Sequence, residues 1–404
     1  MEIQISREST IPLHLQLLNQ LRHRILSGHW PPGSRLPSET MLQRRLGISR
    51  STVRQALHRA ESEGLIERVP GKGTFVARQP GGPPNSRLIG YITFDFLSDF
   101  QRQLLRGAED RARSRGYRIL FCNSNRDVAE EDRLLEQLLA DQVRGILIWP
   151  ALDNRPSRRL FHLAQQCRVP LVLMDRTLPG LRCDHVSSDN YGGAYAAVSH
   201  LIELGHRRIA FLSRPILQLE PVAERLRGYR AALQEAGLSP LEPWLLGAPG
   251  REMDVGYALH TYHAASSQEI QELMRRLDRP DRPTAIFAMN DLMATQALKA
   301  AALVGLQVPE DLSLVGFDDM DIARHLEVPL TTVAQDTFAL GQRAAEFLVE
   351  RLEGYPGPPR REVLPTQLRI RASTGPARAV ERTRAPGPLV EKAQCTPCQG
   401  FTNS

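Results

Sequence analysis

The amino-acid sequence predicts an α/β protein in which a small, basic helical unit with a β-hairpin precedes a long α/β part with room for two lobes. Residues 1–79 hold 12 Lys and Arg against 6 Asp and Glu, whereas residues 80–375 hold 35 against 37. Apolar residues at helical spacing dominate the first part, and short apolar runs alternate with helix-like segments in the second. A Pro- and Gly-rich stretch, residues 79–86, is a linker by composition.

The first part contains three helix patterns and one hairpin pattern. Residues 12–27 place apolar side chains at helical spacing and form the first pattern. Ser38 and Ser49 are suited to cap the second and third helices. Two short apolar runs, 65–69 and 74–77, flank a Pro-Gly-Lys-Gly sequence. That arrangement predicts two strands joined by a tight turn.

The third helix, over about residues 50–63, carries cations without a counter-charge. No acidic residue occurs between residues 47 and 60, so Arg50 and Arg54 have no partner on their own helix. The preceding helix ends only two or three residues earlier, which is helix-turn-helix spacing. In such a motif the second helix enters the major groove, where arginine can bind guanine and serine or threonine can hold phosphate. The alternative is an ordinary amphipathic helix with a solvated basic face.

Residues 10–77 resemble the winged helix-turn-helix domain of the GntR family of bacterial transcription regulators. The stretch GSRLPSETMLQRRLGISRSTVRQALHRAESEGLIERVPGKGTFV follows that family's order and spacing. The family often has Arg or Lys directly after Pro-Ser-Glu, where this chain has Thr40, and Arg44 could compensate. The resemblance implies binding to double-stranded operator DNA through Arg50, Ser51, Thr52, Arg54, Ser38, Arg44, Lys72 and Gly73.

Polar side chains in the second part follow predicted strands. Asn290 comes after the apolar run AIFAM, and Asp318 comes after LSLVGF. Ligands of open α/β sheets bind at the carboxyl ends of strands, where Asn and Asp can exchange hydrogen bonds with sugar hydroxyls. A lone Asp at such a junction is more often a helix cap, and we interpret Asp189 and Asp291 mainly in that way.

Residues 87–375 resemble the effector domain of the LacI/GalR family, which is built like a periplasmic sugar-binding protein. The resemblance extends from RLIGYITF to LPTQLRIRAS. It implies two α/β lobes with parallel sheets, three crossovers and a small sugar bound between the lobes. The effector-binding residues that it implies are Phe100, Gln101, Asp175, Arg225, Asn290 and Asp318. The combination of both parts is similar to the arabinose-responsive repressors of Gram-positive bacteria.

We therefore expect residues 1–78 to be the DNA-binding domain and residues 87–375 to bind the effector and to form a homodimer. The predicted function is that of a cytoplasmic, sequence-specific transcriptional repressor whose operator affinity is controlled by a sugar. A ligand-activated corepressor, or an activator of the same architecture, would carry the same residues and remains an alternative.

Other classes of function lack their motifs. The sequence has no Gly-x-Gly-x-x-Gly after a strand, no Walker sequence and no nucleophile elbow, so we predict neither an enzyme nor a cofactor. The second part would also suit a transport binding protein. Two observations argue against that function: the polar start MEIQISREST has no secretory signal, and a basic, DNA-binding-like unit precedes the second part. The sequence has no run of about 18 apolar residues, so we predict no membrane span.

The five cysteines are scattered and predict no disulfide framework. His260 and His263 have no further metal ligands nearby in the sequence, so we predict no metal site. Cys395 and Cys398 form a lone CxxC within residues 376–404, a Pro-, Gly- and Thr-rich segment that predicts a disordered tail.

Overall fold

The computed structural model of the chain describes residues 5, 12–69, 72–77, 87–96, 98–151, 160, 162, 169–247 and 267–378. The predicted linker, the two histidines considered as metal ligands, and the CxxC with most of the predicted tail lie outside these residues. No helix among the described residues is both long and apolar enough to cross a membrane.

The N-terminal unit has the predicted elements, with ends within about two residues of those expected. In chain order they are α1 (Leu13–Leu26), α2 (Glu39–Leu46), α3 (Arg50–Ser62), β1 (Ile66–Val69) and β2 (Gly73–Val76). The two strands pair antiparallel. The apolar faces of the three helices meet in one core, which includes Leu17, Leu21, Leu42, Val53, Leu57 and Ile66.

Local caps explain where the helices of this unit begin and end. The Ser38 side chain accepts a hydrogen bond from the Met41 backbone at 3.3 Å, and Ser49 accepts one from Thr52 at 3.1 Å. Each hydroxyl satisfies a backbone N–H that has no partner inside its helix. Gly47 ends α2 with a φ of 63°, a left-handed conformation that glycine adopts without steric cost.

The first lobe of the body, lobe 1, is a parallel six-stranded sheet in the order β13-β7-β6-β5-β3-β4. The strands are β3 (Leu88–Thr93), β4 (Arg118–Asn123), β5 (Gly145–Trp149), β6 (Leu171–Met174), β7 (Asp184–Ser188) and β13 (Arg361–Leu364). Its helices include α4 (Asp99–Ser114), α5 (Val128–Ala140) and α13 (Thr337–Leu352). The predicted α/β fold with parallel sheets is confirmed in this lobe.

The second lobe, lobe 2, is another six-stranded sheet in the order β14-β12-β11-β10-β8-β9, parallel except for β14. Its strands are β8 (Ile209–Ser213), β9 (Trp244–Leu245), β10 (Ala285–Ala288), β11 (Ser313–Asp318), β12 (Thr331–Gln335) and β14 (Thr366–Arg369). Its helices include α7 (Asn190–Glu203), α8 (Glu220–Glu235), α10 (Ser267–Leu277), α11 (Asp291–Leu303) and α12 (Ile322–His325).

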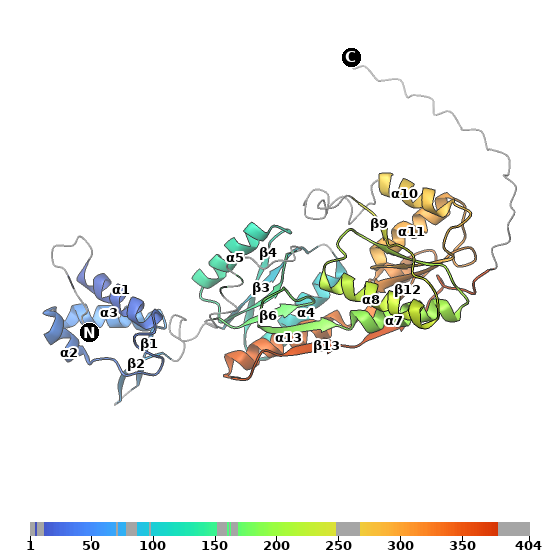
Figure 1. Cartoon of the computed structure of the whole chain (residues 1–404). Coiled ribbons are helices and arrows are strands. Elements are labelled where there is room, and N and C mark those ends of the chain that lie inside the picture. Colours follow the sequence, from blue (N-terminus) through green and yellow to red (C-terminus); the bar gives the residue numbers. More distant parts are fainter. Residues whose placement is uncertain are drawn as a thin grey trace, which may run out of the picture.

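The chain passes between the lobes three times, as expected. It leaves lobe 1 after β7, returns with α13, and leaves again between β13 and β14. On return, α13 packs along α4, and the two helices run side by side in Figure 1. A Cβ at Gly107 would lie 1.9 Å from the Phe338 carbonyl oxygen, and one at Gly341 would lie 2.0 Å from that of Leu104. Glycine at both positions therefore allows close packing of the two backbones.

Candidate functional site

The N-terminal end of α3 presents polar side chains to solvent. Arg50, Ser51 and Arg54 are exposed and Thr52 is half-buried. The Ser49 hydroxyl lies 2.7 Å from the hydroxyls of both Ser51 and Thr52. Hydroxyls and cations at a helix N-terminus match the chemistry that binds a phosphate backbone.

The cations of the N-terminal unit fall into two groups. Arg22 pairs with Glu63 at 2.8 Å, and Arg68 pairs with Glu61 at 3.2 Å. Arg50 comes no closer than 3.9 Å to Glu39, and its side chain is 70% exposed. Within the described residues, an ion pair is found for none of Arg44, Arg54 and Lys72, which are all exposed. This second group supplies an exposed basic surface.

Arg35, which the sequence analysis did not single out, lies against the hairpin. Gly73 has a φ of 120°, which strongly favours glycine, and a Cβ there would lie 3.0 Å from Nε of Arg35. The Arg35 backbone also forms a single antiparallel β-bridge with Phe75 of β2, so its segment lies alongside the hairpin. The side chain of the exposed Arg35 therefore lies against Gly73, the residue after Lys72. The signal available in the sequence was only a basic residue before Leu36-Pro37.

A cavity of about 170 Å³ lies between the two lobes. Lobe 1 and lobe 2 both contribute residues that directly follow their strands. Among these are Phe94 after β3, Asp175 after β6, Arg214 after β8 and Asn290 close after β10. This is where open α/β sheets bind ligands. The remaining lining is Ser98, Phe100, Arg126, Trp149, Arg176, Ile216, Leu219, Pro221, Val222, Arg225, Met289, Leu292, Met293, Gln296 and Asp318.

The cavity brings together five of the six residues predicted from the sequence, namely Phe100, Asp175, Arg225, Asn290 and Asp318. Gln101 does not line it and is only 1% exposed. Its side chain accepts a hydrogen bond from the Ser98 backbone at 2.7 Å and donates one to Asp95. Ser98 and Gln101 have the spacing of a capping box, so the start of α4 uses this side chain.

Arg225 is held by groups from three elements. Its Nε donates to Asn190 at 2.8 Å, and its Nη1 donates to the Met289 carbonyl oxygen. Nη2 lies 3.4 Å from the Asp318 carboxylate, and the guanidinium stacks 3.7 Å from the ring centre of Phe317. These contacts fix the planar fork at the cavity wall, where it can bind a ligand oxygen with defined geometry.

The two cavity carboxylates lie on unusual backbone. Asp175 has a φ of 69° and Asp318 a φ of 104°, a region that residues other than glycine seldom adopt. Such conformations gather at binding sites. Burial raises the pKa of Asp175, although the charges of Arg225 and Arg176 act against this rise. Burial also raises the pKa of Asp318 to about 6, again opposed by Arg225.

Three cavity arginines were missed in the sequence. Arg126 pairs with Asp95 through Nε at 2.8 Å, and Arg214 pairs with Glu269. Arg176 donates to backbone carbonyl oxygens behind the cavity. Arg214 directly follows β8 and Arg176 lies two residues after β6, so the rule that pointed to Asn290 could have found both. Arg126 lies in a turn after β4 and carried no comparable signal.

Asp189 is a helix cap as expected, but Asp291 is not. Asn290 caps α11 by accepting a hydrogen bond from the Met293 backbone at 3.0 Å, and Asp291 is the first residue of that helix. Asp189 caps α7 through a hydrogen bond from the Gly192 backbone at 2.7 Å. Asp291 is fully buried and accepts hydrogen bonds from the Thr332 hydroxyl and the Met320 backbone. No cluster of three or more His, Cys, Asp or Glu suited to a metal ion occurs in the described part of the chain.

Comparison with protein families gives two matches along the chain. The model of bacterial regulatory proteins of the gntR family matches residues 13–76. The model of a periplasmic binding protein-like domain matches residues 198–374.

Curated proteins and solved structures agree with these matches. The arabinose metabolism transcriptional repressor of Geobacillus stearothermophilus is 33% identical over 352 residues, which cover 86% of this chain and 93% of that protein. The ribose operon repressor of Escherichia coli K12 is 30% identical, covering 76% of this chain and 90% of that protein.

The solved complex of the transcriptional regulator CelR with cellobiose aligns with a TM-score of 0.61 at 28% identity, over 89% of this chain and 99% of that one. A LacI family regulator from Enterococcus faecium with bound ribose aligns with a TM-score of 0.57 at 28% identity, over 72% and 100%. The chain therefore belongs to the DNA-binding transcriptional repressors that join a gntR-family domain to a periplasmic binding protein-like effector domain.

Proposed function

We propose that this repressor is a homodimer that leaves its operator when a small neutral sugar binds in the cavity between the lobes. The single observation that carries the proposal is the cavity itself, in which side chains of both lobes converge at the ends of parallel strands. The exposed basic surface of the N-terminal unit supplies the contact with operator DNA.

The charges around the cavity support a neutral ligand. The lining contains four arginines and two aspartates, and Asp95 and Glu269 pair with two of these arginines from behind. The four positive charges are thus matched by four negative ones. A balanced set of donors and acceptors suits the hydroxyls of a sugar, whereas a sugar acid or phosphate would call for an excess of cations.

The size of the cavity supports a small ligand. Its volume of about 170 Å³ is below the roughly 300–1,000 Å³ of pockets that take drug-sized molecules. The aromatic rings of Phe94, Phe100 and Trp149 give apolar surface for the face of a sugar ring. The names of the relatives, which include arabinose and ribose repressors, favour a pentose.

The proposed mechanism couples the cavity to the DNA-binding units. In a homodimer two winged helices would meet the two halves of an inverted repeat. A sugar that contacts both lobes favours the closed arrangement and changes the spacing of the DNA-binding units. A coupling free energy of about 1–3 kcal/mol would change operator affinity roughly 5- to 150-fold.

Operator binding tests this function directly. The purified full chain is titrated onto duplex DNA from the region upstream of its own gene, at fixed salt because phosphate contacts make affinity salt-dependent. The titration is repeated with L-arabinose, D-ribose, D-xylose, hexoses, sugar acids and sugar phosphates. We expect one neutral sugar to weaken binding. Binding strengthened by a sugar would establish a corepressor, and indifference to the whole panel would refute sugar control.

A further inference from the structure

Glu220 connects the two lobes at the edge of the cavity. It opens α8, the helix of lobe 2 that also supplies Arg225 to the cavity. One of its carboxylate oxygens accepts hydrogen bonds from the Thr177 backbone N–H at 2.6 Å and from the Thr177 hydroxyl. The other oxygen forms an ion pair with Arg361. Both partners belong to lobe 1, so one carboxylate of lobe 2 binds two points of lobe 1.

The partner on the cavity side lies directly beside the ligand-binding groups. Thr177 follows Asp175 and Arg176, which line the cavity from lobe 1. Glu220 precedes Pro221 and Val222, which line it from lobe 2. If the lobes separated at this edge, Thr177 would move away from Glu220 and the cavity would open at the same time.

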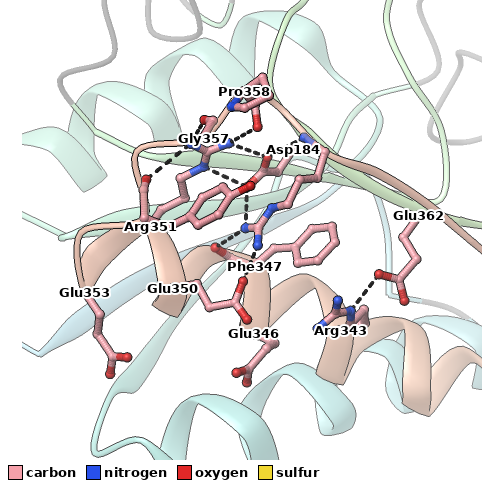
Figure 2. A network of polar contacts seen from close by, with 12 residues as sticks. Asp184, Arg343, Glu346, Phe347, Glu350, Arg351, Glu353, Gly357, Pro358 and Glu362 are labelled. Carbon is pink, nitrogen blue, oxygen red and sulfur yellow. Dashed lines mark hydrogen bonds and ion pairs between the residues drawn. The ribbon is translucent and has the colours of Figure 1, made fainter.

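The second partner, Arg361, directly follows a charge network that is centred on the buried Asp184. Arg351 donates to the Asp184 carboxylate at 2.8 Å (Figure 2). Arg360, which precedes Arg361, donates to the same carboxylate at 2.8 Å. The Asp184 side chain has no exposed area. Burial raises the pKa of Asp184, but hydrogen bonds from Arg351 and Arg360 outweigh that effect and keep it below its usual value. The network therefore ties α13 and β13 to the start of β7.

That network has a consequence for the position of Arg361. It holds β13 against β7 in a register that places Arg361 opposite His185. Arg351 further donates to the carbonyl oxygen of Pro358 at 2.8 Å, which holds the loop that leads into β13 (Figure 2). The backbone of Arg361 is thus fixed on lobe 1, and its side chain, which is 59% exposed, reaches toward lobe 2 to meet Glu220.

Glu220 keeps its charge in this position. Burial raises the pKa of Glu220, but the two Thr177 hydrogen bonds and the positive charge of Arg361 outweigh this effect, with a net decrease. Its side chain is 23% exposed. The part-buried hydrogen bonds from Thr177 to this ionised carboxylate carry most of the link. The ion pair with Arg361 adds less, because exposed salt bridges contribute little.

We propose that Glu220 is a positioning residue that holds the two lobes together over the ligand, through a clasp formed by Glu220, Thr177 and Arg361. This inference rests on the proposed sugar-controlled function. It adds the residue that determines how much sugar is needed to release the protein from its operator. A contact made only when the lobes are closed favours the closed form, and a ligand that needs that form binds more tightly as its population rises. The clasp therefore sets how much sugar is needed for release, while the properties of the fully liganded protein stay the same.

The test compares three variants of the full chain with the wild type. Glu220→Ala removes all contacts of the clasp, and Glu220→Gln removes the charge while keeping an acceptor for Thr177. Glu224→Gln is the matched control, because Glu224 lies one turn further along α8 and pairs with Arg227 of the same helix. Operator-bound protein is titrated with L-arabinose, D-ribose and D-xylose at fixed salt, and small-angle X-ray scattering measures the radius of gyration without sugar.

For Glu220→Ala we expect the sugar concentration at half release to rise about tenfold, with an unchanged plateau at saturating sugar and a larger radius of gyration without sugar. Glu220→Gln should fall between this variant and the wild type, and Glu224→Gln should match the wild type. A wild-type half-release concentration in Glu220→Ala would overturn the clasp, and so would a loss of operator binding without sugar, which would indicate a purely structural role.

Failure of the proposed function gives a different result. If the wild type itself ignored every sugar, sugar control would be rejected, and the scattering measurement would then decide about the clasp alone. Equal radii of gyration for the wild type and Glu220→Ala would overturn it, and a larger radius for the variant would support it.

Discussion

Replacement of Asp318 by asparagine should stabilise the ligand-free protein at neutral pH and weaken sugar binding. The Asp318 side chain is 12% exposed and lies 3.4 Å from Nη2 of Arg225. It also accepts a hydrogen bond from Gln335 at 2.6 Å. Despite these partners, burial raises its pKa from 3.8 to about 6. The folded protein therefore favours the protonated form of Asp318 more than the unfolded chain does.

The size of the effect follows from this pKa. A group whose pKa is raised on folding contributes stability that is complete below its unfolded pKa and is lost as the pH rises through the folded value. At about 1.36 kcal/mol for each pKa unit, a rise from 3.8 to about 6 makes the ionised side chain cost about 3 kcal/mol at pH 8. Asparagine is uncharged throughout, so the variant should gain up to about that amount at pH 8 and almost nothing near pH 4.

Urea unfolding of the wild type and Asp318→Asn at pH 4.5, 6 and 8 measures this difference, with tryptophan fluorescence as the signal. Asp278→Asn, at an exposed position, is the control and should show no gain. Isothermal titration with the inducing sugar should show affinity reduced about 10- to 150-fold, because a hydrogen bond to a charged group contributes about 1.5–3 kcal/mol. A variant less stable than the wild type at pH 8 would refute the reasoning, since it would mean that the contact with Arg225 outweighs the cost of burial.

Three further predictions concern the cavity and the N-terminal unit. Arg225→Lys should lower sugar affinity at least tenfold in isothermal titration, because an ammonium group cannot reproduce the planar fork that meets several partners at once. Arg54→Ala should cost about 1–3 kcal/mol of operator affinity and relax base preference in a binding assay with variant duplexes, whereas Lys72→Ala should weaken all duplexes alike and reduce the salt slope by about one. Ser49→Ala should lower the free energy of unfolding by about 1 kcal/mol in urea titrations, because α3 loses its cap.

Much of the fold could be predicted from short-range signals. The caps at Ser38 and Ser49 and the left-handed Gly47 set helix ends through contacts within four residues, so the local sequence was sufficient to predict them. Alternation of strands and helices was equally visible, because hydrophobic periodicity depends only on which side of an element faces the core. The position of Asn290 and Asp318 at strand ends then placed them at one edge of a sheet.

The same local rules explain where the sequence analysis and the structure differ. Gln101 has the right place at the start of α4 to face the cavity, but its capping partner Ser98 lies three residues away and takes up the side chain. The spacing was visible in the sequence. Whether the Gln101 side chain caps α4 or faces the cavity could be decided only from its direction in the structure.

What the sequence by itself determined is the type, order and ends of the elements, and the kind of residue at each strand end. Only the tertiary structure decided which charges meet. Arg126 pairs with Asp95 across 31 residues of chain, and Glu220 meets Arg361 across 141. The first pair forms within lobe 1, where the pairing of β3 with β4 brings the two strand ends together, whereas the second depends on the passages of the chain between the lobes. No local pattern of residues indicates which distant segments will meet.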